Sequence, residues 1–398
     1  MPPTATARSL QGVRKWLVLL VALCGLIGPV AQSPAVGQRY TPIVMSVTSG
    51  PQWFKGTDGS YSLVYELRLT NGFGTPVKIS SIGVRDGDGK PLVRLAGTRL
   101  RRSLTLLADP TKPTLEVPGS TVAVAWMQLR FAHRSEIPSR IEHVLTVRPS
   151  PGLPVPRSIA DVGGRAKVDL AGPVVIGPPL VGDNWVAVGS CCDGPHRRAL
   201  QPVNGRLFLG QRFAVDWNGM DAEDRFVNGD PDTNAGWTFY GKPVVAVADA
   251  TVVEAVDRFP EQVPNDARPV TLQEADGNYV ILKIGPHQFV GYAHLQHGSV
   301  AVRAGQHVRR GDPVGALGNS GSSTGPHLHF QVMDAPSLVA ANGLPFVIDR
   351  FTEVGTIPPL SAALARRLAR GLPAPIDRHG AGPQVDALPL GRDVVDFP

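Results

Sequence analysis

The sequence predicts an all-β protein built from two domains. Its 398 residues are 42% hydrophobic, which is enough to bury a sizeable core. The 38 prolines and 44 glycines favour short strands and turns over long helices. Stretches in which hydrophobic and polar residues alternate recur along the chain, and this alternation is typical of half-buried strands.

Residues 1–37 have the pattern of a secretory signal. Arg8, Arg14 and Lys15 precede the hydrophobic run 16–27, and small or helix-breaking residues follow it. The run is shorter than the roughly 20 residues that a membrane-spanning helix needs, although an uncleaved anchor is the alternative. We therefore expect an exported protein, in the periplasm, cell envelope or extracellular space, with no stable membrane span after the signal is removed.

Residues 40–148 predict an immunoglobulin-like β-sandwich. In SYSLVYELRLTN (residues 60–71), Leu63 and Leu67 fall on one face of a strand and Glu66 on the other. Similar stretches follow, and Asn-Gly, Asp-Gly and Pro-Gly pairs separate them. Short strands at this spacing are typical of a small antiparallel sandwich, and no group of residues within it indicates catalysis.

The rest of the chain divides into three predicted parts. Residues 149–180 begin with a Pro-rich stretch and predict a linker. Residues 181–352 contain further short strands, including a hairpin that turns at Pro286-His287, and predict a second β domain. Residues 355–398 contain one possible basic helical turn within Pro- and Gly-rich sequence, which predicts a flexible C-terminal tail.

The chain carries a formal net charge of +6. The basic residues are spread along the sequence instead of being concentrated in one run, so they predict an affinity for an anionic cell-wall surface and not for nucleic acid.

Three cysteines are present, and Cys24 lies within the predicted signal. The remaining two, Cys191 and Cys192, are adjacent, which excludes an ordinary disulfide framework. They could form a vicinal disulfide or contribute to a metal site. The simplest expectation is two small buried hydrophobic residues.

The densest motif is GNSGSSTGPHLHF, which ends with His327 and His329. On a strand, residues at positions i and i+2 point to the same face, so both imidazoles face one side. This arrangement suits two metal ligands, or one ligand and one acid/base group. The alternative for such a pair, taken alone, is two exposed histidines.

The surrounding motifs resemble those of the lysostaphin-like zinc metallopeptidases. GNYVILKIG, GYAHL, VRRGDPVGALG and GNSGSSTGPHLHFQV occur in this order, and the resemblance covers roughly residues 205–350. It implies an antiparallel β-sheet peptidase domain with the duplicated hybrid motif fold. It also implies a zinc cofactor and cleavage of peptides in bacterial peptidoglycan.

The resemblance also implies roles for particular residues. His329 and Asp216 correspond to zinc ligands, His327 to a histidine beside the metal-bound water, and His294 of GYAHL to a second acid/base group. The family's remaining ligand is a histidine four residues before the aspartate, where this sequence has Arg212. Arginine has no lone pair to offer a metal, so a third ligand must come from elsewhere.

We predict His196 as this third ligand, because an imidazole would restore a set of two histidines and one carboxylate. Arg212 would then pair with a carboxylate of the protein or hold a carboxylate of the substrate. Other residues that could bind zinc are Cys191, Cys192, Asp193, His297 and His307.

The predicted function is that of an exported zinc metalloendopeptidase that hydrolyses peptide bonds of peptidoglycan stem peptides or cross-bridges. Arg212 supports the alternative of a catalytically impaired member of the same fold. Such a protein would bind cell-wall peptides or regulate another wall hydrolase.

Overall fold

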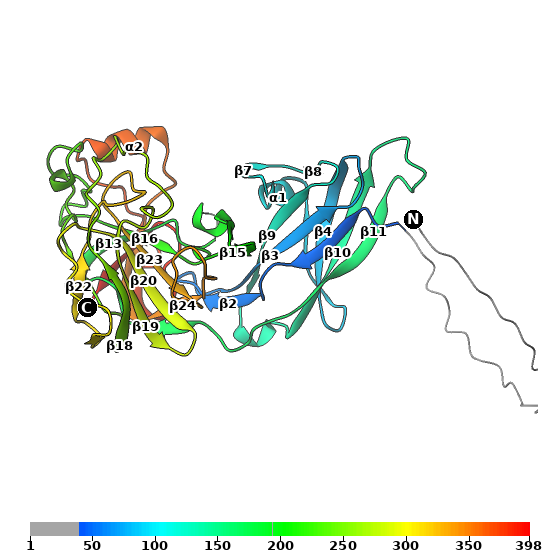
Figure 1. Cartoon of the computed structure of the whole chain (residues 1–398). Helices are drawn as coiled ribbons and strands as arrows, with labels where there is room; N and C mark the ends of the chain where they lie inside the picture. Colours follow the sequence, from blue (N-terminus) through cyan, green and yellow to red (C-terminus); the bar gives the residue numbers. More distant parts are fainter. Residues whose placement is uncertain (1–39, 193) are drawn as a thin grey trace, which may run out of the picture. The chain divides into compact units, whose positions relative to one another are not determined.

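The computed structural model describes residues 40–192 and 194–398, and within them the protein is nearly all β, as predicted (Figure 1). None of the helices in these ranges is long and hydrophobic enough to cross a membrane. The predicted signal, residues 1–37, lies outside the described residues.

Two antiparallel sheets form the N-terminal part. One has the strand order β1-β3-β9-β6-β7, with β2 also paired to β3, and the other has the order β11-β10-β4-β5, with β8 also paired to β4. The strands of the first sheet are β1 (Ile43–Val47), β2 (Gln52–Lys55), β3 (Tyr61–Asn71), β6 (Leu104–Leu106), β7 (Asp109–Pro113) and β9 (Val122–Phe131). Those of the second are β4 (Val77–Asp86), β5 (Pro91–Ala96), β8 (Glu116–Val117), β10 (Arg140–Pro149) and β11 (Ile159–Lys167). A short helix α1 (Gly97–Arg102) and a 3-10 turn η1 (Arg134–Glu136) connect strands.

Hydrophobic side chains from both sheets share one core, so this part is a β-sandwich. Leu63 and Leu67 of β3 pack in the same cluster as Ile82 of β4 and Leu145 of β10. The opposite face of β3 is also buried, because it packs on the second domain: Val64 belongs to that domain's core. The prediction of a half-buried strand is therefore wrong for β3, which is covered on both faces.

The predicted linker 149–180 is largely structured. β11 pairs with β10 and completes a sheet of the sandwich. β12 (Val174–Ile176) pairs in parallel with β24 of the second domain. The prediction of a linker is wrong for these two segments, because the backbone groups of both are hydrogen-bonded within sheets.

The second domain is built on one large sheet with the order β12-β24-β26-β13-β16-β23-β20-β19-β18-β21. Apart from the β12–β24 pair, its strands are antiparallel, and β19 and β20 form the predicted hairpin around Pro286-His287. The principal strands are β13 (Gly182–Val188), β16 (Val215–Gly219), β18 (Ala250–Val256), β19 (Asn278–Gly285), β20 (Gln288–Leu295), β21 (His307–Val308), β23 (Leu328–Met333) and β24 (Phe346–Thr356). Two small sheets pair β14 (Gln201–Val203) with β15 (Arg206–Phe208) and β17 (Pro243–Val245) with β22 (Pro313–Ala316), and 3-10 turns occur at η2 (His196–Arg198) and η3 (Asn234–Gly236).

The predicted flexible tail, 355–398, is part of the fold. It contains α2 (Ala362–Ala369), β25 (Gly382–Ala387) and β26 (Asp393–Phe397). β26 lies between β13 and β24 and pairs with both, and Val394 and Val395 are fully buried. The prediction of a flexible tail is wrong because a short central strand buried on both faces has no alternating pattern to reveal it.

Glu353 in β24 is expected to make the stability of the fold depend on pH. Burial, and then the charge of Asp393, raise the pKa of this carboxyl to about 7, against the hydrogen bond that Gln384 donates to it. In the unfolded chain the group ionises near 4.5. Because the folded state holds the proton over this interval, the free energy of unfolding falls as pH rises from about 4.5 to about 7.

The variant Glu353→Gln should therefore show a weaker loss of stability over this interval than the wild type. Melting temperatures at pH 5 and pH 8 measure the difference. Glu116→Gln, which changes an exposed carboxylate on β8, is the control and should keep the wild-type dependence. An unchanged dependence in Glu353→Gln would contradict the assignment.

Candidate metal centre

Neighbouring strands of the large sheet carry the centre of the site. β16 and β23 are antiparallel partners, and Asp216 lies directly opposite His329 in this pair. On its other side β23 pairs with β20, where Ala293 lies opposite His329. Because residues opposite one another in a sheet share a face, the Asp216 and His329 side chains meet on the same surface.

His196 joins this pair from a loop outside the sheet. Its Nε2 lies 3.1 Å from Asp216 Oδ2, and His329 Nδ1 lies 2.9 Å from Asp216 Oδ1. One ligand atom from each of the three residues lies within 4.8 Å of the others. Two imidazoles and one carboxylate fit a catalytic zinc ion, which takes three protein ligands and leaves a fourth position open. The structure thus brings together the three residues predicted as ligands.

Gln331 contacts the His329 ring at Nε2, on the side away from Asp216, and so orients it. His329 Nε2 lies 3.0 Å from Gln331 Oε1, and Gln331 Nε2 donates to Leu338 O at 3.1 Å. The Nε2–H donated to this oxygen leaves Nδ1 as the nitrogen that faces Asp216 and that would bind a metal after losing its proton. Gln331 is absent from the predicted site residues, although it lies two residues after His329 and the strand period places it on the same face.

The carboxyl of Asp216 is held in its ionised form. Burial by itself would raise its pKa, but the charge of His327 and the hydrogen bonds from His196 and His329 outweigh burial, and the pKa lies well below its usual value. Burial acts to lower the pKa of His329, and the hydrogen bond and charge of Asp216 overcome it and raise that pKa. An ionised carboxylate among imidazoles is the form that binds a cation.

His294 and His327, the predicted acid/base residues, stand beside the three ligand residues. The centroids of their rings are 4.8 Å apart, and His327 Nε2 lies 3.6 Å from Asp216 Oδ1. His294 Nδ1 lies 2.8 Å from Ser320 O, and His327 Nδ1 lies 2.9 Å from Gly325 O. A carbonyl oxygen only accepts, so Nδ1 of each ring carries a proton.

The environment keeps His294 neutral. Burial, and then the charges of His327 and His329, lower its pKa well below the usual value. Its backbone N–H donates to Asp276 O at 3.0 Å, and its φ of +61° is uncommon for a residue other than glycine. A neutral imidazole with a free lone pair is able to accept a proton.

Arg212 points away from the site into the sandwich. Its guanidinium is fully buried, with Nη2 donating to Glu66 Oε2 at 2.7 Å and Nη1 donating to Gln52 Oε1 at 3.3 Å. Glu66 belongs to β3 and Gln52 to β2. Arg212 was predicted either to pair with a carboxylate of the protein or to hold one of the substrate. In the structure it pairs with a carboxylate of the protein.

The remaining candidate ligands are bonded or distant. Cys191 and Cys192 form a disulfide with each other, so the expectation of two unbonded cysteines is wrong, and neither thiolate is available to a metal. His297 is exposed in the turn after β20, and His307 lies on the edge strand β21. Asp193 lies outside the described residues.

Part of this domain is similar to known peptidases. Residues 236–341 match Peptidase family M23, a range that includes His294, His327 and His329 but begins after Asp216. An uncharacterized metalloprotease of Haemophilus influenzae is 38% identical over 91 residues, which are 23% of this chain and 16% of that protein. The peptidoglycan DD-endopeptidase ShyA of Vibrio cholerae is 42% identical over 57 residues, which are 14% of this chain and 13% of that protein.

A longer similarity involves the cell division protein DipM of Caulobacter vibrioides, which is 23% identical over 205 residues, or 50% of this chain and 29% of that protein. The chain therefore spans less than a third of the length of each of these three relatives. Among solved structures, the catalytic domain of lysostaphin from Staphylococcus simulans is 26% identical. The match covers 30% of this chain and 84% of that chain, with a TM-score of 0.20.

Proposed function

We propose that this protein, which matches Peptidase family M23 over residues 236–341, is an exported zinc metalloendopeptidase acting on bacterial peptidoglycan. It hydrolyses peptide bonds of stem peptides or cross-bridges. The observation that carries the proposal is the convergence of His196, Asp216 and His329 within 4.8 Å, beside two further imidazoles. The peptidoglycan endopeptidases among the relatives support the substrate class, and the signal pattern in residues 1–37 supports export.

Three residues hold the metal in this proposal: His196 through Nε2, Asp216 through its carboxylate, and His329 through Nδ1. A zinc ion bound there supplies a Lewis acid that polarises the scissile carbonyl and lowers the pKa of a water molecule to about 7.

His294 and His327 supply the proton transfers. Nδ1 of each ring donates to a backbone carbonyl oxygen, which leaves Nε2 of each ring as the nitrogen that can exchange a proton. One histidine accepts the proton of the attacking water, and the other, once protonated, donates a proton to the leaving amine. Asp216 lies 3.6 Å from His327 Nε2 and stabilises the charge that His327 gains on protonation. A backbone carbonyl orients each ring through Nδ1, so either order of roles fits.

Metal analysis of the purified protein tests the proposal. We expect about one zinc per chain, lost in His196→Ala and in His329→Ala because two remaining ligands make a poor site. His307→Ala, on the edge strand β21, is the control and should keep the metal. Cleavage of purified peptidoglycan should disappear together with the zinc.

The alternative is a catalytically impaired member of the same fold that binds wall peptides or regulates another hydrolase. The same metal analysis distinguishes this alternative from the peptidase. Arg212 is the observation that favours it, because this residue stands where the family has a metal ligand. Protein that holds no zinc and cleaves no wall peptide even after zinc loading would overturn the peptidase proposal. Binding of wall peptides by that protein would support the alternative.

A further inference from the structure

His196 is the one proposed ligand that no strand holds in place. Asp216 and His329 sit on paired strands, whereas His196 follows the loop that leaves β13 and opens the 3-10 turn His196–Arg198. A ligand on a loop needs other contacts to keep its geometry, because sites built on strands are held more precisely. The contacts around His196 show which residues supply that support.

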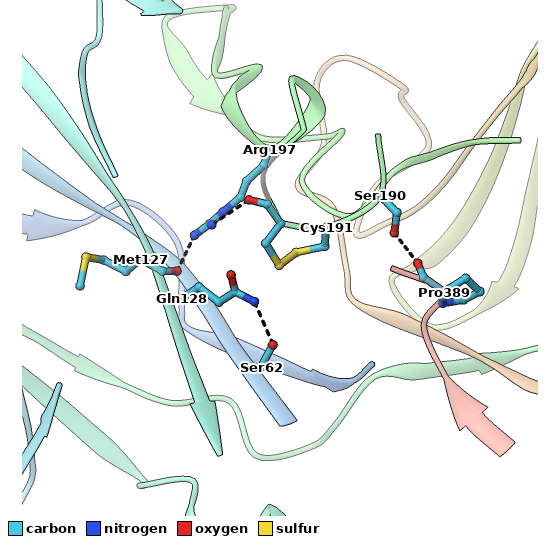
Figure 2. The surroundings of a disulfide bond; sticks show 8 residues. Ser62, Met127, Gln128, Ser190, Cys191, Arg197 and Pro389 are labelled. Carbon is cyan, nitrogen blue, oxygen red and sulfur yellow. Dashed lines mark hydrogen bonds between the residues drawn. A yellow bond between two sulfur atoms is a disulfide. The ribbon is translucent and has the colours of Figure 1, made fainter. Parts of the chain in front are cut away.

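The loop is folded tightly against the His196 ring. At Gly189, where φ is +67°, an added Cβ would lie 2.9 Å from the ring's Cε1 and Nδ1. An added Cβ at Gly194 would lie 2.6 Å from Gly189 O, so the two ends of the loop also touch. Ser190 donates to Pro389 O at 2.6 Å and ties the start of the loop to the C-terminal segment (Figure 2).

Arg197, the residue after His196, ties the end of the loop to the sandwich. The residue is 4% exposed. Nη1 donates to Cys192 O within the loop at 3.1 Å, and Nη2 donates to Met127 O on β9 (Figure 2). One guanidinium therefore bridges two backbone carbonyls, one in the ligand loop and one in the N-terminal domain.

We infer that Arg197 is a positioning residue for the metal ligand His196. Through this arginine the sandwich helps to hold His196 in the geometry that binds the metal. This inference rests on the proposed function, since it takes His196 to bind zinc. Arg197 anchors the 3-10 turn at the position next to the ligand, and the acceptor lies on β9, a strand paired on both sides within its sheet. The same sheet of the sandwich also holds Arg212, through Glu66 of β3, which lies opposite Trp126 of β9.

Arginine is required for this anchor because its planar fork directs two N–H groups at two acceptors, while lysine has a single ammonium on a flexible stem. The variant Arg197→Lys keeps the charge and loses the fork. Partners that orient metal ligands typically change metal affinity by about 10–100-fold when they are altered. We expect a loss of zinc affinity of this size in Arg197→Lys.

The experiment measures zinc affinity by competition with a chelator at neutral pH for the wild type, Arg197→Lys and Arg197→Gln. Arg198→Lys is the matched control: the neighbouring arginine makes an exposed contact of 3.2 Å to Arg102 O, and its affinity should match the wild type. Visible spectra of the cobalt(II)-loaded proteins give a second reading. Those of the two Arg197 variants should move toward the spectrum of His196→Ala. Circular dichroism identifies a variant that fails to fold. If one Arg197 variant fails to fold, the zinc affinity of the other Arg197 variant tests the inference.

Folded Arg197 variants with wild-type zinc affinity and an unchanged cobalt spectrum would overturn the inference while leaving the proposed function intact. Wild-type protein that binds no zinc would overturn the proposed function and, with it, this inference. Because the first result concerns the variants and the second concerns the wild type, the two failures are distinguishable.

Discussion

In the proposed zinc peptidase, replacing His294 with alanine is expected to lower kcat by about 10²–10⁴-fold without loss of the metal, the size of effect that a general acid/base group contributes. His294 is outside the ligand set, so removing it should leave the metal in place. Its imidazole is neutral and keeps a free Nε2, and alanine offers no group that can accept or donate the proton. Steady-state cleavage of a wall peptide and zinc content, measured on the same preparation, test this expectation.

His297→Ala is the control for His294→Ala. It removes the same type of side chain three residues later, from the exposed turn that follows β20. Wild-type kcat is expected for this control. A His294→Ala variant with wild-type kcat would remove His294 from the mechanism, and a variant without zinc would make it a residue on which metal binding depends.

Replacing Glu66 with leucine is expected to destabilise the protein by about 3–5 kcal/mol, because removing one partner of a buried ion pair leaves the other charge uncompensated. Neither side chain of the Arg212–Glu66 pair is exposed, and the two atoms lie 2.7 Å apart. The free energy of unfolding in urea measures the effect. The double variant Glu66→Leu/Arg212→Met should recover most of the loss, since a buried pair replaced as a whole by hydrophobic residues costs little.

An exposed ion pair provides the comparison for Glu66. In the Arg165–Glu142 pair the arginine side chain is 79% exposed, so Glu142→Leu should cost no more than about 1 kcal/mol. Equal losses in the two single variants would mean that Glu66 and Arg212 do not form a buried pair in solution.

The positions that the sequence identifies best are those on strands with a regular period. His327 and His329 were predicted to share a face, and the structure places both beside Asp216. His196 was predicted from chemistry, because Arg212 cannot bind a metal and an imidazole nearby could. The structure places His196 within reach of Asp216, and its role as a ligand stays a prediction.

The contacts that cross between the two domains could not be predicted in the same way. Glu66 sits in an ordinary alternating strand, where a charged residue is normally expected to face solvent. Arg197 lies in a single 3-10 turn, and its partner on β9 is a backbone carbonyl, which no residue type in the sequence reveals. These residues acquire their roles only when the second domain covers the outer face of β3 and β9.

The position of β26 sets the order in which this domain can be assembled. β13 lies between β16 and β26 in the sheet, yet β26 comes from the opposite end of the domain's sequence. Pairings between segments far apart in the chain close slowly, because much chain entropy is lost before the contacts form. Backbone N–H of Arg392 also donates to Ala187 O at 2.6 Å, just before the loop that bears His196. We therefore expect β16, β20 and β23 to pair well before β26 does, so that the proposed metal centre is completed only when the last strand has been added.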